Sequence, residues 1–258
     1  MPSILTQQDL RAARQRDFCY ICGKALPTDQ KPSSDHVPPT SLFAVPDRNP
    51  PLILPTHHDC NLERTGQDEL IGQIVSILRG DIPRPEIIKL PLFAIDRGPG
   101  QTPRGGLHDF PFISIVFRWV RGFHAALYGQ FLPDRGGFIW APFVGSNELH
   151  GPPTDDRADR HLFTQKFKAQ AKINRLDQVV CRNGNCEYGC FWLRFDDGSP
   201  FCIFGLRIYE WERLSDPERP PPRGCLGWYR ADTPEGAALG TEVEVPVANL
   251  EPLDPFGA

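Results

Sequence analysis

Two pairs of metal-type ligands constrain the fold of this chain more than any other feature. Cys19 and Cys22 are separated by two residues, and His57 stands at the same spacing from Cys60. Each pair places two ligand atoms on one side of a tight turn, so the four side chains can close a tetrahedral Cys3His zinc site. Such a site is structural, because four protein ligands leave no position for a substrate. We therefore expect Zn2+ to hold this part of the chain together.

Three alternatives stay open for these residues. His58 is one position out of register and competes with His57 as the fourth ligand. A Cys-x-x-Cys pair is also typical of redox proteins, but a thioredoxin-like motif needs a strand before it and a helix after it. Here helix-like sequence precedes the pair, and the turn-rich residues 23–32 follow it. Unligated thiols are the third alternative.

A second set of residues, interleaved with the first, suits a different chemistry. Asp35 and His36 lie between the two pairs, and Asn61 directly follows the second pair. Carboxylate and amide oxygens are ligands for a hard cation such as Mg2+. A neutral imidazole near pH 7 suits a general base. We expect the zinc to hold the frame and this second set to carry the reaction.

The strings Asp35-His-Val-Pro-Pro and Cys60-Asn-Leu-Glu-Arg resemble those of the HNH endonucleases, the ββα-metal or His-Me finger family, in a form with an interleaved zinc knuckle. The resemblance covers residues 15–80. It implies a β-hairpin followed by a helix, with His36 as the general base. It also implies that Asp35 and Asn61 hold one Mg2+ or Mn2+ ion in the cleft that His36 faces.

The chain departs from the pattern of that family in two places. Many members have a second Cys-x-x-Cys where this chain has His57 and Cys60. The middle Asn of the family, which pins the hairpin loop, has only Asn49 as a candidate here. Arg64 lies three residues after Asn61, and we expect it to contact a flanking phosphate of the substrate; a solvated helix charge is the alternative.

The charge distribution bears on the partner. The net charge of −4, taken alone, argues against a nucleic-acid binder. Residues 81–175, however, carry 13 basic against 9 acidic residues, whereas residues 176–258 carry 7 against 14. A basic segment beside a metal site suits a protein that binds the phosphate backbone of DNA, since neutralising phosphates releases counterions. Solvated helix faces are the alternative.

A chain of 258 residues, 40% of them hydrophobic, can bury a substantial core. The pattern of helices and strands along it favours an α+β protein. We expect a zinc-stabilised ββα-metal module at 1–80, a linker rich in proline and glycine at 81–108, and a separate α+β domain at 109–258. Cys181, Cys186 and Cys190 lack paired spacing, so we expect thiols there rather than a second zinc. The expected helices are 6–16, 59–80, 109–128 and a basic helical segment at 160–175. The expected strands are 52–54, 138–140, 190–195, 201–209 and 242–247.

These observations predict a metal-dependent DNA endonuclease, with a non-catalytic zinc module that binds nucleic acid or protein as the alternative. No stretch approaches twenty apolar residues without a charge, so we expect no membrane partner. The N-terminus shows no basic region followed by an apolar run, and we therefore expect a reducing, cytoplasmic setting.

Overall fold

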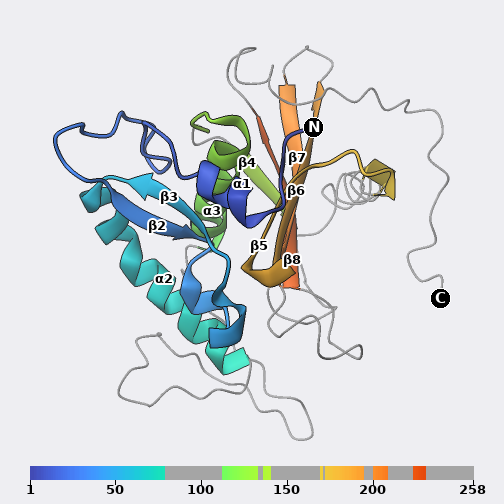
Figure 1. Cartoon of the computed structure of the whole chain (residues 1–258). Helices are drawn as coiled ribbons and strands as arrows, with labels where there is room; N and C mark the ends of the chain where they lie inside the picture. Colours follow the sequence, from blue (N-terminus) through green and yellow to red (C-terminus); the bar gives the residue numbers. More distant parts are fainter. Residues whose placement is uncertain are drawn as a thin grey trace, which may run out of the picture.

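The protein has an α+β fold. The computed structural model (Figure 1) describes residues 1–78, 112–132, 136–140, 169–170, 172–194, 200–208 and 223–230. Among these described residues, no helix has the length and apolar character that crossing a bilayer requires. The predicted strand at 242–247 lies outside them, as does most of the helical segment predicted at 160–175.

The chain opens with a short strand and a capped helix. β1 spans Ser3–Ile4, and α1 spans Gln7–Ala12. The backbone N–H of Asp9 donates to the Thr6 hydroxyl at 3.2 Å, while the Asp9 carboxylate accepts from the Thr6 backbone N–H at 2.9 Å. This reciprocal pair is a capping box, as the sequence predicts, and it fixes where the helix begins.

A hairpin and a long helix follow. β2 (Ser33–Val37) pairs antiparallel with β3 (Leu52–Thr56), and α2 (His58–Leu78) begins two residues after the hairpin ends. The loop between the strands contains two short 3-10 turns, η1 (Thr40–Leu42) and η2 (Val45–Arg48). The strand predicted at 52–54 and the helix predicted from residue 59 are both present. The order is strand, strand, helix.

The remaining strands form one six-stranded sheet in the order β1-β5-β6-β7-β8-β4. β1 runs parallel to β5, and the other neighbouring pairs are antiparallel. The short turn η4 (Arg182–Gly184) joins β5 to β6. The strands are β4 (Gly136–Trp140), β5 (Asp177–Cys181), β6 (Cys186–Arg194), β7 (Pro200–Ile208) and β8 (Arg223–Arg230).

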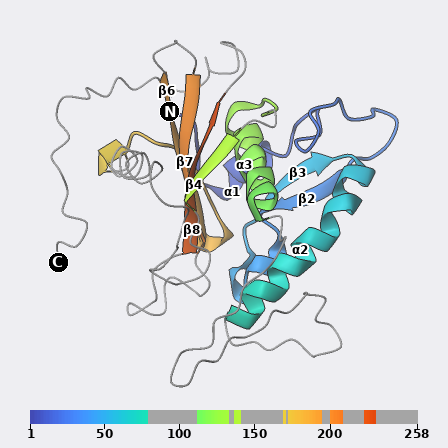
Figure 2. The ribbon, with the colours of Figure 1, turned by 180° about the vertical axis from the view of Figure 1, so that it is seen from behind.

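Helix α3 (Phe112–Tyr128) lies between the sheet and the hairpin, as both views show (Figures 1 and 2). On one side Phe123 stacks on Tyr188 of β6, with ring centroids 4.6 Å apart. On the other side the backbone of Gly122 lies against Val37 of β2 and Tyr20. The helix therefore joins the two halves of the molecule.

One buried cluster holds residues from both sides of the predicted linker. It includes Leu10 and Leu54 from the N-terminal part and Trp119 and Phe204 from the part beyond the linker. The linker predicted at 81–108 lies outside the described residues, so the domain boundaries stay a prediction. The N-terminal unit nevertheless buries its apolar surface against α3, and truncation before α3 would expose that surface to water.

Candidate metal centre

The first ligand pair sits on a tight turn that backbone hydrogen bonds close. Gly23 N–H donates to the carbonyl of Cys19 at 2.8 Å, and Cys19 N–H donates to the carbonyl of Lys24 at 2.9 Å. Gly23 has a φ of +76°, a left-handed conformation that glycine adopts without strain. The turn thereby directs the Cys19 and Cys22 sulfurs to one side.

The structure brings the four predicted zinc ligands together. The ligand atoms of Cys19, Cys22, His57 and Cys60 all lie within 4.8 Å of one another. His57 Nδ1 is 3.4 Å from Cys22 Sγ and 3.9 Å from Cys60 Sγ. Tetrahedral zinc with bonds of about 2.0–2.3 Å separates its ligands by about 3.3–3.8 Å. The cluster can therefore hold a metal ion such as zinc.

His57, rather than His58, completes the cluster that could hold a metal ion. His57 Nε2 donates to the carbonyl of Ala25 at 3.0 Å, which leaves Nδ1 for the metal and fixes the ring orientation. The His58 side chain is 80% exposed and points to its neighbour Asp59, 3.5 Å away. Of the two histidines that the sequence offers, the geometry places His57 with the three cysteines and His58 away from them.

The protonation of the thiols also fits a metal site. Burial opposes ionisation of Cys22, but the hydrogen bond from the backbone N–H of Lys24 and the neighbouring side chains of the cluster lower its pKa overall. Burial, together with the nearby Cys19 and Cys22 sulfurs, raises the pKa of Cys60 to about 12. Three sulfurs this close cannot all ionise unless a cation shares the site, and a bound metal deprotonates its thiol ligands. The donor set therefore suits Zn2+.

Asp35 turns into the core instead of lining an open cleft. It is 6% exposed, and its Oδ2 accepts a hydrogen bond of 2.5 Å from the Tyr20 hydroxyl. The same oxygen lies 3.6 Å from Arg118 Nη1 of α3, and Arg118 also forms an ion pair with Asp68 of α2. The carboxylate thus already has a buried cation beside it.

His36 lies on the other face of β2. Successive side chains of a strand point to opposite faces, and the burial of Asp35 and Val37 with a half-buried His36 between them follows that alternation. Burial lowers the pKa of His36, and the positive charge of Arg182 lowers it further. The expectation that Asp35 and His36 serve one cleft is not met, because the regular pairing of β2 with β3 separates them.

Asn61 and Arg64 lie on the first turns of α2. Asn61 Nδ2 donates to Ser33 Oγ at 3.0 Å and to the Ser34 carbonyl at 3.4 Å, which fastens α2 to β2 and leaves the amide oxygen for a ligand. Arg64 is half-buried, and Asn49 is exposed at the end of η2.

The oxygen donors expected for Mg2+ or Mn2+ fit only in part. Asn61 offers an oxygen, whereas the Asp35 carboxylate lies in the core with Tyr20 and Arg118 against it. A hydrated divalent cation keeps several waters and needs open positions for them. The arrangement around Asp35 does not fit such an ion.

Sequence reasoning missed Tyr20, Asp68 and Arg118 as neighbours of the predicted catalytic strand. Arg118 stands within a mainly apolar helix sequence, and it is 5% exposed. Because a buried charge is costly unless it is paired, a charge at the apolar centre of a predicted helix is the signal that points to such a network.

The other cysteines do not add a second metal centre within the described residues, where the Cys3His cluster is the only group of its kind. Cys181 and Cys186 lie opposite each other on the neighbouring strands β5 and β6; both are buried free thiols. The Tyr128 hydroxyl lies 3.3 Å from Cys190 Sγ. These thiols are part of the core.

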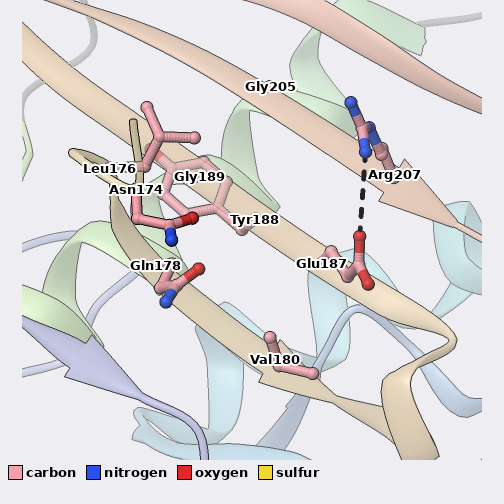
Figure 3. Close-up of a pocket in the computed structure, with 9 residues that line it drawn as sticks. All are labelled: Asn174, Leu176, Gln178, Val180, Glu187, Tyr188, Gly189, Gly205 and Arg207. Carbon is pink, nitrogen blue, oxygen red and sulfur yellow. Dashed lines mark ion pairs between the residues drawn. The ribbon is translucent and has the colours of Figure 1, made fainter. Parts of the chain in front are cut away.

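A separate hollow of about 220 Å³ lies on the outer face of the sheet (Figure 3). Its floor includes Gly189 and Gly205, which pair across β6 and β7, and its rim carries the ion pair of Glu187 and Arg207 at 4.0 Å. Tyr188, which precedes Gly189 on β6, points its side chain toward α3. The side chains of Glu187 and its alternate neighbours therefore point to the opposite face of the sheet, where the hollow lies. The sheet and α3 separate it from the metal centre.

Comparison of the chain with protein-family models, curated proteins and solved structures found no match. The candidate metal centre is supported by the positions of its four potential ligand atoms.

Proposed function

We propose that this chain is an HNH-type endonuclease that hydrolyses phosphodiester bonds of DNA, with Zn2+ as a structural ion. The observation that carries the proposal is the order of β2, β3 and α2 around the Cys3His cluster. The same unit bears His36 on the strand face that the core does not use. Resemblance to the HNH strings supports the assignment of the activity.

His36 is the general base in this proposal. Its lowered pKa keeps the imidazole neutral at pH 7, so a ring nitrogen can take a proton from water. The resulting hydroxide attacks the phosphorus, the bond from phosphorus to the leaving ribose oxygen breaks, and that oxygen acquires a proton from solvent. No oxidant or reductant takes part.

The divalent cation implied by the resemblance would stabilise charge on the scissile phosphate. Asn61 would hold it through its amide oxygen. Asp35 fits this role poorly, because Tyr20 and Arg118 contact its carboxylate. We therefore assign Asp35 to the support of β2.

The non-catalytic zinc module is the second candidate, and one observation favours it. Asp35, the residue that most resembles a catalytic ligand by sequence, is buried with protein partners. In that case the zinc frame would present a binding surface for nucleic acid or protein, and His36 would have no part in a reaction.

Nicking of supercoiled plasmid by the zinc-loaded full chain separates the two candidates. With Mg2+ or Mn2+ added, we expect nicking that His36→Ala slows by about 100-fold or more, the usual contribution of a general base. His58→Ala is the matched control, since this histidine is exposed and not a ligand. Equal rates for wild type and His36→Ala would remove His36 from the mechanism; DNA binding without nicking would favour the second candidate.

A further inference from the structure

Two free cysteines face each other at the end of a β-hairpin. Cys181 is the last residue of β5, Cys186 is the first residue of β6, and the two are partners in the antiparallel register. Opposite residues of such strands have Cα atoms about 4.5–5.5 Å apart, within the roughly 4.4–6.8 Å that a disulfide spans. The strands therefore already hold the two free thiols where a disulfide can join them.

The two thiols interact with each other, and their environments differ. A hydrogen bond from Cys186 lowers the pKa of Cys181, and the positive charge of Arg182 lowers it further against the opposing effect of burial. Burial raises the pKa of Cys186 well above its usual value. Cys181 is therefore the thiol that ionises more readily, and a thiolate is the nucleophile in thiol oxidation.

Arg182, the residue after Cys181, is a buried cation beside this pair. It is 0% exposed, and the sulfurs of Cys181 and Cys186 oppose the lowering of its pKa by burial. Its guanidinium carbon lies 5.1 Å from the centroid of the Phe43 ring, which fixes the position of the charge. A thiolate at Cys181 has this buried positive charge nearby, and a neighbouring cation favours the thiolate.

The turn between the two cysteines is fastened to the loop that joins β2 to β3. The Arg182 backbone N–H donates to the Pro50 carbonyl at 2.8 Å. The Arg182 guanidinium donates to the Pro38 carbonyl at 2.9 Å and to the Arg48 carbonyl. Pro38 lies two residues after His36, so the turn holds the loop where the strand of the proposed general base ends.

The turn itself has an unusual backbone and lies at the surface. Arg182, Asn183 and Gly184 have φ angles of +57°, +55° and +80°, the left-handed region that favours glycine. Asn185 closes the turn, because its N–H donates to the Arg182 carbonyl at 2.8 Å. Asn183 is exposed, so the buried thiols lie beneath a surface turn. Two strained residues in a row favour local opening, which admits a small oxidant.

We propose that Cys181 and Cys186 form a reversible disulfide that locks this turn, and with it the loop between β2 and β3. With hydrogen peroxide as the oxidant, the Cys181 thiolate attacks one oxygen, the O–O bond breaks, and the leaving hydroxide takes up the Cys181 proton to become water. Cys186 then attacks the sulfur of the sulfenic acid, and the second oxygen leaves as water with the Cys186 proton. The two thiols lose two electrons and two protons, and the peroxide is reduced to two waters. A thiol reductant reverses the bond by exchange.

Peptide mapping after oxidation tests the bond. The zinc-saturated full chain is treated with one equivalent of hydrogen peroxide, its free thiols are alkylated, and the protein is cut with trypsin. Trypsin cuts after Arg175, Arg182 and Arg194, so the disulfide links peptides 176–182 and 183–194. We expect this linked pair in the wild type, its loss after a thiol reductant, and its absence from Cys186→Ala. A wild type that yields only the separate, alkylated peptides would overturn the proposal.

Cys190→Ala is the matched control, because Cys190 lies in the same peptide and is also buried, but its register partner is Phe204. The link should persist in this variant; a link that Cys190→Ala removes and Cys186→Ala keeps would overturn the pairing.

Hydrogen exchange of the wild type tests the lock. The backbone N–H of Arg182 should exchange about tenfold or more slowly in the oxidised protein, because a disulfide restricts opening of the segment that it closes. Equal exchange in the oxidised and reduced proteins would overturn the lock on the loop. Neither measurement depends on plasmid nicking, so the disulfide and the nuclease proposal fail or hold separately.

Discussion

The Tyr20 hydroxyl donates a hydrogen bond of 2.5 Å to Asp35 Oδ2. Tyr20 lies between the two cysteines of the first ligand pair, whereas Asp35 lies on β2. The bond therefore couples the position of the turn that carries Cys19 and Cys22 to the strand that carries His36. Burial, reinforced by the negative charge of Asp35, raises the pKa of Tyr20 well above its usual value, so the phenol stays a donor.

Replacing Arg118 tests whether this network is structural. Arg118→Met leaves Asp35 and Asp68 without their shared cation in a buried setting. Removal of one partner from a buried ion pair costs about 3–5 kcal/mol, and we expect a loss of that size in urea unfolding with zinc retained. Arg64→Gln is the control and should change the free energy of unfolding by less than about 0.5 kcal/mol. A stable Arg118→Met protein would show that the fold does not depend on the ion pairs of Arg118 with the two carboxylates.

The sequence predicts the metal centre well because the ligand spacing is local. A Cys-x-x-Cys turn and a His-x-x-Cys helix start each place two ligands by backbone geometry alone. The hairpin and α2 follow in the same way from prolines and apolar periodicity. Even the separation of Asp35 from His36 was predictable, since neighbours on a regular strand face opposite sides.

The contacts of Arg118 with Asp35 and Asp68 could not be predicted from the sequence in this way, because they depend on packing between distant segments. Arg118 meets Asp35 and Asp68 only when α3 docks on the hairpin, and no local pattern encodes that docking. The strand β1 was also missed. Two residues are too few to show an alternating pattern, and β1 exists because β5 supplies its partner.

The two adjacent histidines give a matched test of the zinc site. His57→Ala removes a ligand and should abolish stoichiometric zinc binding, measured by metal analysis of the purified chain. Because metal binding of this kind is coupled to folding, the variant should also lose solubility. His58→Ala should keep one zinc and wild-type stability, since that side chain is 80% exposed. Zinc retained by His57→Ala and lost by His58→Ala would reverse the assignment.

Two glycines test the docking of α3. A Cβ on Gly122 would lie 2.8 and 2.9 Å from the two Cγ atoms of Val37, too close for ordinary contact. Gly122→Ala should therefore destabilise the protein by about 1–3 kcal/mol, the usual cost of overpacking. Gly66 on α2 has nothing within 4 Å of such a Cβ, and Gly66→Ala should stabilise by about 0.5–1 kcal/mol through helix propensity. Chemical unfolding of both variants compares the signs directly, and a stabilised Gly122→Ala would mean that α3 does not press on β2.

The buried His124 should make the free energy of unfolding depend on pH. It is 2% exposed on α3, with its ring 4.8 Å from that of Tyr128 and 6.1 Å from that of Trp192. Burial lowers its pKa to about 3, whereas an unfolded histidine titrates near 6.5. Below pH 6.5 the unfolded chain therefore binds a proton that the folded chain does not. The contribution of His124 is complete above pH 6.5 and is lost as the pH falls toward 3.

The expected slope is about 1.4 kcal/mol per pH unit, the value for one proton taken up on unfolding. Asp177 acts in the opposite sense, because burial raises its pKa and acid then favours the folded chain. Acid also releases zinc, so urea unfolding of the zinc-saturated wild type is compared with that of His124→Gln at each pH between about 6.5 and 4.5. The zinc and Asp177 terms are common to both proteins and cancel in the difference. We expect His124→Gln to be the less acid-sensitive protein by nearly the full slope; parallel curves would mean that the folded chain accommodates a protonated His124.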